Sequence, residues 1–181
     1  MKTIGDVHVI ELFKQDPETA FKRIVEEYQD RIFNLCVYML RSREDAQDAA
    51  QDVFVNAYRS FKNFTPHASL YTWLYRIALN TCIDYKRKSQ RLLVEDEASI
   101  FEIASQGPSP EKVCESKEVR AVIKETLESL TPDFRAVIVL REIEGLSYEE
   151  ISEVLQISIG TVKSRISRAR DELRQLLRDK L

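Results

Sequence analysis

The chain has 181 residues, of which 44% are hydrophobic and 31% charged, and its net charge is −3. The length fits one average domain or two small ones, and the hydrophobic content argues against wholesale disorder. The net negative charge excludes a uniformly basic surface for binding nucleic acid. The chain has only four Gly and five Pro, and this low content favours long helices over a strand-rich fold.

The composition also argues against a membrane span, a secretion signal and a metal site. The longest apolar runs, such as Ala136–Leu140, are far shorter than the roughly 20 residues that cross a bilayer. The N-terminal stretch carries acids and has no continuous apolar run, unlike a signal peptide. Cys36, Cys82 and Cys114 form no CxxC pair, and neither histidine has a partner at ligand spacing. We therefore expect a cytoplasmic protein with reduced thiols, no metal and no cofactor.

The segment 16–92 is predicted to form a first helical domain. Apolar residues recur at steps of three and four from Phe21 to Met39, which indicates one amphipathic helix or a broken pair. Ser42 is placed to cap the next helix, Glu44–Phe61, and acids in its first turn favour the helix dipole.

A loop over 65–69 separates these helices from a third long helix, Leu70–Arg91. Beyond that helix the hydrophobic periodicity fails. The run Gly107-Pro108-Ser109-Pro110 forbids a continuous helix, because proline lacks a backbone donor and restrains the residue before it. The acidic segment 93–118 is therefore predicted to be a flexible linker between two domains.

The segment 119–181 contains clear signals for the starts and ends of helices. Thr131-Pro132-Asp133 is typical of a helix start, and Gly145 ends that helix. Ser147 with Glu150 forms a capping box, and Ser158 is placed to cap a further helix after a turn of three or four residues. This spacing predicts a helix-turn-helix.

The last of these helices has two different faces. One is an apolar stripe at four-, three- and four-residue steps, made of Val162, Ile166, Ala169 and Leu173. The other carries Lys163, Ser164, Ser167 and Arg168. No acid lies between Ser158 and Arg170, and Arg165 and Arg170 flank the basic face where phosphate contacts are expected. A solvated cationic face is the alternative, but the capping, the tight turn and the missing acids together favour major-groove binding.

One face of the helix Leu70–Arg91 mixes an aromatic ring with polar groups. Its residues step by three or four along the helix and are Trp73, Arg76, Asn80, Asp84 and Arg87. Such a face suits stacking and hydrogen bonding to unpaired bases. The alternative is that Trp73 belongs to the core and Arg76 pairs with an acid, and for Trp73 taken alone the core placement is favoured.

Three stretches together resemble a known family. They are DAQDAAQDVFVNAYRSFKNF, SLYTWLYRIALNTCIDYKRK and LREIEGLSYEEISEVLQISIGTVKSRISRARDEL. In this order they resemble the bacterial RNA polymerase sigma factors of the extracytoplasmic-function (ECF) group. The resemblance covers roughly 20–88 and 127–176 and implies an all-α protein with two small helical domains, sigma region 2 and sigma region 4, joined by a flexible linker.

The resemblance implies three functional surfaces. The helix Glu44–Phe61 would dock on the clamp coiled coil of the largest core polymerase subunit, through Asp48, Gln51, Asp52 and Asn56. The next helix and its loop would recognise and melt the −10 element and hold the single non-template strand, through Thr65, Pro66, His67, Ala68, Ser69, Trp73, Arg76, Asn80, Lys86, Arg87 and Lys88. Region 4 would read the −35 element through Arg141, Lys163, Ser164, Ser167 and Arg168, with Arg165 and Arg170 at the flanks.

The chain differs from many members of this family at two positions, and the resemblance also implies one further partner. Relatives often carry Arg where this chain has Lys163 and an aromatic residue where it has Ser167. Because lysine lacks the bidentate fork of arginine, we expect a different −35 sequence. Many relatives are held inactive by an anti-sigma factor, which is often bound to the membrane, so we expect such a partner and no direct membrane insertion by this chain.

Two other classes of function stay open on the sequence alone. A one-component regulator would bind palindromic duplex without polymerase, but the first half offers no evident dimer seam or effector site. An enzyme acting on nucleic acid would need clustered carboxylates or a nucleophile with its base, and the nearest acidic pair is Asp48 with Asp52.

Overall fold

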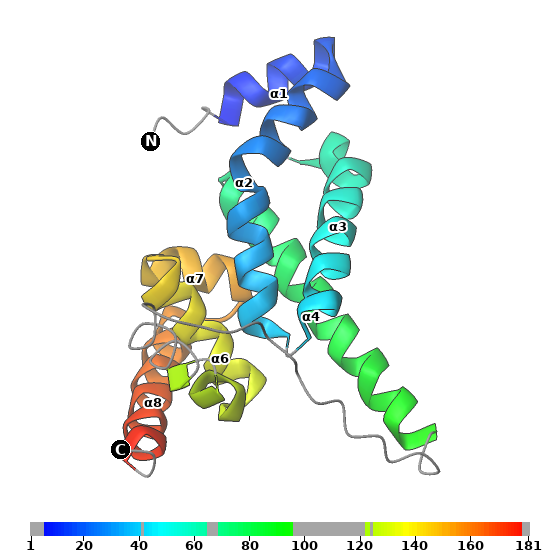
Figure 1. Ribbon diagram of the computed structural model, residues 1–181. Helices are drawn as coiled ribbons and strands as arrows, with labels where there is room; N and C mark the ends of the chain where they lie inside the picture. The colour runs from blue at the N-terminus through cyan, green and yellow to red at the C-terminus, as the bar shows by residue number, and fades with distance from the viewer. Residues whose placement is uncertain (1–5, 41, 65–68, 96–121, 124, 179–181) are drawn as a thin grey trace, which may run out of the picture.

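The computed structural model describes residues 6–40, 42–64, 69–95, 122–123 and 125–178 (Figure 1). Within these ranges every regular element is a helix, which confirms the all-α prediction. Of the predicted linker, residues 93–95 belong to a helix and the rest lies outside the described residues. Thr65, Pro66, His67 and Ala68 of the predicted loop also lie outside them.

The first half of the chain is a bundle in which α2 (Pro17–Met39), α3 (Arg43–Ser60) and α4 (Leu70–Glu95) pack against one another. The predicted amphipathic segment is one continuous helix, α2. The third helix continues four residues beyond its predicted end at Arg91. The second begins and ends one residue early and passes into a 3-10 turn, η1 (Phe61–Asn63).

A short helix, α1 (Asp6–Gln15), precedes this bundle and was not predicted. It packs against α2 (Figure 1). Asp16 separates the two helices, because its carboxylate oxygen Oδ1 accepts a hydrogen bond of 3.0 Å from the Thr19 amide and so caps the N-terminus of α2. Pro17 fills the first helical position, where no backbone donor is needed.

The second half contains α6 (Pro132–Ile138), the π-helix η2 (Val139–Ile143), α7 (Tyr148–Leu155) and α8 (Ile159–Arg178). The predicted caps are confirmed at all three starts. The hydroxyl oxygens of Thr131, Ser147 and Ser158 accept from amides three residues ahead, at 3.4, 3.1 and 3.1 Å.

The ends of these helices follow from local conformation. Gly145, with φ of +73°, reverses the chain after η2, as the sequence predicted, although the last turns before it widen into the π-helix. Gln156 ends α7 in the left-handed region, with φ of 54°. This produces the tight turn of the helix-turn-helix between α7 and α8.

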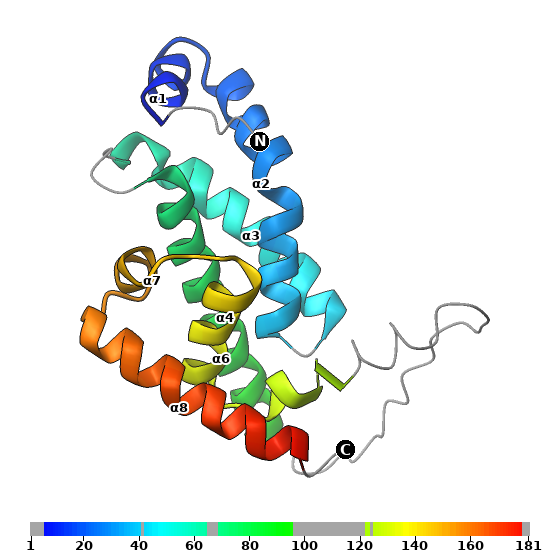
Figure 2. The same ribbon diagram turned by 90° about the vertical axis from the view of Figure 1, so that its left-hand side faces the viewer.

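The cores of the two halves join. In the turned view of Figure 2, α6 and α7 lie alongside the first bundle, and contacts link α7 to α4 and α6 to α2. Cys36 and Cys82 are free thiols buried in the first core, as predicted. Mutual hydrogen bonding and burial raise the pKa of the Cys82 thiol, so it stays protonated.

Candidate nucleic-acid interface

Helix α8 presents the predicted basic face to solvent. Val162, Ile166 and Ala169 are fully buried, which fixes the rotation of the helix. On the other side, Lys163, Ser164, Ser167 and Arg168 are all exposed. Among the described residues, no ion pair involves Lys163 or Arg168, so both cations are available to a ligand.

Three other predicted arginines are engaged within their own domain. Arg165 pairs with Asp133 at 2.7 Å, and Arg170 pairs with Glu142 at 2.5 Å. The hydrogen bond to Glu142 raises the pKa of Arg170. The Arg141 guanidinium donates to the Leu146 carbonyl at 2.6 Å, and it also lies 4.9 Å from the centre of the Tyr148 ring.

The pairs of Arg165 and Arg170 hold α8 against α6 and η2, and the contacts of Arg141 hold η2 against the start of α7. Because the three guanidinium groups already have partners, they differ from the two unpaired cations at the start of α8. The sequence could not separate the two groups, since their partners come from residues 5 to 32 positions away along the chain.

The predicted −10 face of α4 is only partly exposed. Trp73 is 8% exposed, and its ring centre lies 5.8 Å from that of Phe61 and 5.1 Å from that of Phe64. In this arrangement Trp73 is a core residue, the placement that the sequence favoured for it taken alone. Its packing holds Phe64 immediately before the loop.

The polar residues of the same helix are more accessible. Asn80 and Lys88 are exposed, whereas Arg76 and Lys86 are half-buried. Arg87 is 3.8 Å from Asp84, so Asp84 pairs with this arginine.

Ser69 is the one residue of the predicted loop 65–69 that the structure describes. Its hydroxyl oxygen accepts a hydrogen bond of 3.1 Å from the Thr72 amide and exchanges another of 2.7 Å with the Thr72 hydroxyl. Ser69 therefore caps the N-terminus of α4, a role that the sequence analysis missed. The predicted loop therefore ends at the capped N-terminus of α4.

Helix α3 exposes all four residues predicted to dock on polymerase, Asp48, Gln51, Asp52 and Asn56. Asp52 also has a partner on α4. The Tyr85 hydroxyl donates to its carboxylate oxygen Oδ2 at 2.7 Å, and this bond raises the pKa of Tyr85 to about 12. The predicted docking face is thus tied to the −10 helix.

A hollow of about 320 Å³ lies beside this face, between α2 and α3. Its lining combines aromatic and aliphatic side chains with amides and one carboxylate, from Val25, Gln29, Asp30, Phe33, Gln47, Ala50, Gln51 and Phe54. The sequence analysis did not find this hollow, because its walls come from two helices whose relative rotation is set only in the folded core.

The part of the chain that the structure describes holds no cluster of three or more metal-ligating side chains. Nor does it hold a helix long and apolar enough to cross a membrane. The candidate site consists of exposed faces of α3, α4 and α8.

Comparisons with known proteins identify the family. Models described as Sigma-70 region 2 and Sigma-70, region 4 match residues 24–92 and 120–173. The RNA polymerase sigma-H factor of Pseudomonas aeruginosa is 37% identical over 95% of this chain and 93% of the relative. The ECF RNA polymerase sigma factor SigW of Bacillus subtilis is 38% identical over 94% of this chain and 95% of the relative.

Two solved structures share the fold. The sigma factor RpoE of Bartonella quintana, in complex with the anti-sigma factor NepR, matches with a TM-score of 0.73 and 26% identity over 87% of this chain and 96% of that one. CnrH, in complex with the cytosolic domain of CnrY, matches with a TM-score of 0.73 and 28% identity over 97% of this chain and 99% of that one.

These matches define a transcription initiation factor of bacterial RNA polymerase. The chain belongs to the ECF group of sigma-70 factors, as the sequence resemblance predicted. It is an alternative sigma factor, which binds core polymerase, recognises −35 and −10 promoter elements and promotes melting. Membership of this family replaces the hypothesis of a one-component regulator, which the sequence alone had left open.

Proposed function

We propose that the chain divides promoter recognition among three of its helices. Helix α8 reads the −35 element, α4 with the loop before it selects and holds the −10 strand, and α3 docks on core polymerase. The observation that carries this proposal is the acid-free, solvent-exposed face of α8, where Lys163 and Arg168 have no ion-pair partner among the described residues.

The residues proposed to act at the −35 element fall into two groups. Readers contact the bases, and supports hold the helices in place. Lys163 and Arg168 lie in the N-terminal half of α8, which a helix-turn-helix inserts into the major groove, and their cations suit guanine O6 and N7. Ser164 and Ser167 are small enough to let the helix approach the bases. Ser164 already donates to the Thr161 carbonyl at 3.0 Å, so its hydroxyl is orientated to accept.

Arg141, Arg165 and Arg170 have a different role in this proposal. Arg165 and Arg170 are held by carboxylates of α6 and η2 and brace α8, whereas Arg141 is held by the Leu146 carbonyl and braces η2. All three add positive potential near the phosphates. Their removal would weaken binding to all sequences alike, whereas removal of a reader would relax specificity at one base pair.

The −10 element is proposed to bind across the start and the middle of α4. The loop 65–69, fixed at one end by the Ser69 cap and at the other by Phe64, would form the pocket for an extruded base. The exposed Asn80 would contact the unpaired strand. Extrusion costs a few kcal/mol, least at weakly stacked A·T-rich sites, which stacking and a close pocket must offset.

The phosphates of that strand would meet the cations of α4, which are Arg76 in its N-terminal half and Lys86, Arg87 and Lys88 in its C-terminal half. Trp73 would act through the core by holding Phe64, because its side chain is buried against the rings of Phe61 and Phe64. The energy for strand separation comes from binding alone.

Core polymerase is proposed to dock on α3 and the hollow beside it. Asp48 and Asp52 offer acceptors to a basic surface, and Val25, Phe33 and Phe54 offer apolar contacts in the hollow. A helix laid along a groove uses this combination of apolar anchors and charged rim. The clamp coiled coil of the largest polymerase subunit fits this chemistry.

Regulation by an anti-sigma factor is part of the proposal. A structure with the same fold, that of RpoE from Bartonella quintana, is a complex of a sigma factor with the anti-sigma factor NepR. A protein that covers α3 or α8 of this chain would block polymerase or promoter and keep the factor inactive. The chain itself is proposed to stay in the cytoplasm, whether or not its partner is held at the membrane.

Reconstituted transcription tests this function. Purified chain and bacterial core polymerase are incubated with a genomic fragment library, and the 5′ ends of the transcripts are sequenced. We expect discrete starts that share −35 and −10 motifs and disappear without the chain. Sequence-specific duplex binding by the chain alone, with no such starts, would contradict the proposal.

A further inference from the structure

A hydrogen bond joins the helix proposed to dock on polymerase to the helix proposed to hold the −10 strand. The Tyr85 hydroxyl on α4 donates to the carboxylate oxygen Oδ2 of Asp52 on α3 at 2.7 Å. The two residues are 33 positions apart in the sequence and meet because α3 and α4 pack against each other. The sequence analysis gave Tyr85 no role.

The two partners differ in how firmly they are held. The ring of Tyr85 is half-buried and packs against the core of region 2, so its neighbours fix the position of the hydroxyl. Asp52 is exposed on α3. Among the described residues no ion pair involves Asp52. The bond therefore joins a fixed donor to a carboxylate that is otherwise free to rotate.

Tyr85 holds this carboxylate without neutralising it. The hydrogen bond to Asp52, burial and the negative charges of Asp52, Asp48 and Asp45 raise the pKa of Tyr85 to about 12. The phenol is therefore a neutral donor at neutral pH. Because it brings no positive charge, the acidic potential of α3 remains available to a cationic partner.

The geometry leaves room for such a partner. A carboxylate accepts hydrogen bonds through both of its oxygens, and the bond from Tyr85 uses Oδ2 of Asp52. The oxygen Oδ1 still has its acceptor sites. Asp48 is exposed one turn before Asp52 on the same side of α3, since residues four apart on a helix are neighbours. A lysine or arginine can therefore bind this pair while the bond to Tyr85 stays intact.

We propose that Tyr85 is a positioning residue for polymerase docking, whose hydroxyl fixes the Asp52 carboxylate in the orientation that a cation of the partner meets. This inference rests on the proposed function, in which Asp52 contacts core polymerase. A side chain that is already oriented loses less freedom on binding, so preorganisation strengthens the contact without adding a new one. The residue that orients the docking face then lies on the helix that carries the −10 cations.

The test measures how tightly core polymerase binds the wild-type chain, Tyr85→Phe, Asp52→Ala and the double variant. Each full-length chain displaces a fluorescently labelled wild-type chain from bacterial core polymerase, and fluorescence anisotropy gives its dissociation constant. Phenylalanine keeps the ring of Tyr85 and removes only the hydroxyl. The matched control is Tyr38→Phe, which removes a hydroxyl from another half-buried ring, on α2, for which the described residues show no hydrogen bond.

The expected result is a loss of affinity that depends on Asp52. Tyr85→Phe should raise the dissociation constant by about two- to tenfold, the range for ordering one side chain on binding. Asp52→Ala should raise it at least as far, because it also removes the charge. In the Asp52→Ala chain, Tyr85→Phe should have no further effect, since the hydroxyl has no carboxylate left to hold. Tyr38→Phe should bind as the wild type does.

This dependence on Asp52 separates positioning from a general loss of stability. Circular dichroism at the assay temperature confirms that each chain is folded. A chain weakened only in its fold would lose affinity through Tyr85→Phe whether or not Asp52 is present. The double-mutant cycle measures that difference directly.

Three outcomes would overturn the positioning role while leaving Asp52 in the docking surface. They are wild-type affinity of Tyr85→Phe beside a weakened Asp52→Ala, equal weakening by Tyr85→Phe with and without Asp52, and tighter binding by Tyr85→Phe. The last would mean that the bond competes with docking. An unchanged affinity of Asp52→Ala would instead count against the proposed docking surface, and the role of Tyr85 would fall with it.

Discussion

Replacement of Arg135 by methionine would destabilise region 4 more than removal of any surface cation. The Arg135 guanidinium is 1% exposed and donates to four main-chain carbonyls. The acceptors are Leu127 at 2.8 Å, Glu128 at 2.7 Å, Leu130 at 3.2 Å and Met39 at 3.0 Å. Three of these belong to the helical turns before α6, so this side chain organises the entry into region 4.

The magnitude follows from what methionine leaves behind. It keeps most of the apolar stem, so the packing loss is small. The bonds to Leu127, Leu130 and Met39 are buried, and each orphaned carbonyl costs about 1–3 kcal/mol. Because the removed charge no longer needs desolvation, the costs do not add fully. We expect a loss of about 3 kcal/mol in the free energy of unfolding.

Urea unfolding followed by circular dichroism measures this loss. The control is Arg174→Met on α8, whose guanidinium is 67% exposed and pairs with the nearby Asp171. An exposed pair of this kind contributes about 0–1 kcal/mol. If Arg135→Met lowers stability by no more than the control does, the carbonyl cluster does not hold region 4 together, and the reasoning from buried acceptors is wrong.

Three further predictions concern the recognition surfaces. Arg168→Ala should weaken binding of the holoenzyme to promoters with a −35 element by about 1–3 kcal/mol, measured by filter binding, with competition for core unchanged. Asp48→Arg combined with Asp52→Arg should impair competition with other sigma factors for core polymerase, because a basic partner would face like charge. Tyr85→Phe should abolish a phenol titration near pH 12, followed by ultraviolet absorbance. The folded-state pKa of Tyr85 is raised, so its bond to Asp52 stabilises the fold fully below pH 10 and loses that effect as the pH rises through 12.

Matched variants keep the first two of these tests specific. Arg178→Ala removes an exposed cation at the far end of α8 and should leave promoter binding within twofold of wild type. Asp171→Arg reverses a charge outside α3 and should leave core competition intact. Loss of core binding by Arg168→Ala, or unaltered competition by the α3 double variant, would remove those residues from their assigned surfaces. A persistent titration near pH 12 in Tyr85→Phe would assign it to another tyrosine.

Local signals in the sequence were sufficient to predict most helices. The caps at Ser42, Thr131, Ser147 and Ser158 are all present, because an N-cap depends on residues within one turn of it. The apolar stripe of α8 is buried for the same reason. Helix α1 escaped prediction, since ten residues carry too weak a periodic signal to stand out.

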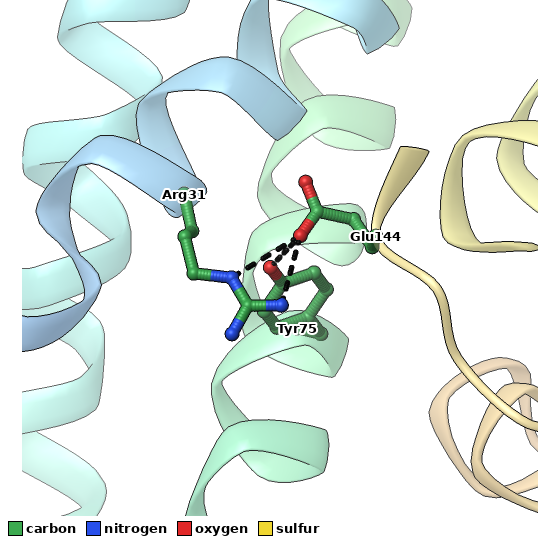
Figure 3. A network of polar contacts seen from close by, with 3 residues as sticks. All are labelled: Arg31, Tyr75 and Glu144. Atoms are coloured by element: carbon green, nitrogen blue, oxygen red, sulfur yellow. Dashed lines mark hydrogen bonds and ion pairs between the residues drawn. The ribbon is translucent and has the colours of Figure 1, made fainter. Parts of the chain in front are cut away.

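Features that depend on distant partners could not be predicted. The carboxylate of Glu144 accepts hydrogen bonds from Arg31 and Tyr75, which are 113 and 69 positions away, and no spacing rule relates these residues (Figure 3). The burial of Trp73 was left open by the sequence, because an aromatic residue on a mixed helix face fits either a core or a stacking platform. Its contacts with Phe61 and Phe64 decide the matter only once η1 has turned the chain toward α4.

The pattern of ion pairs explains how an acidic chain can recognise DNA. With 30 acidic residues against 27 basic ones, evenly mixed charges would leave no local attraction for phosphate. The fold instead pairs Arg165 and Arg170 with acids of neighbouring elements and leaves Lys163 and Arg168 unpaired among the described residues. Because only these two cations of the basic face of α8 are unpaired among the described residues, phosphate contacts there give weak, salt-sensitive binding. Selectivity then depends on both promoter elements being held at once.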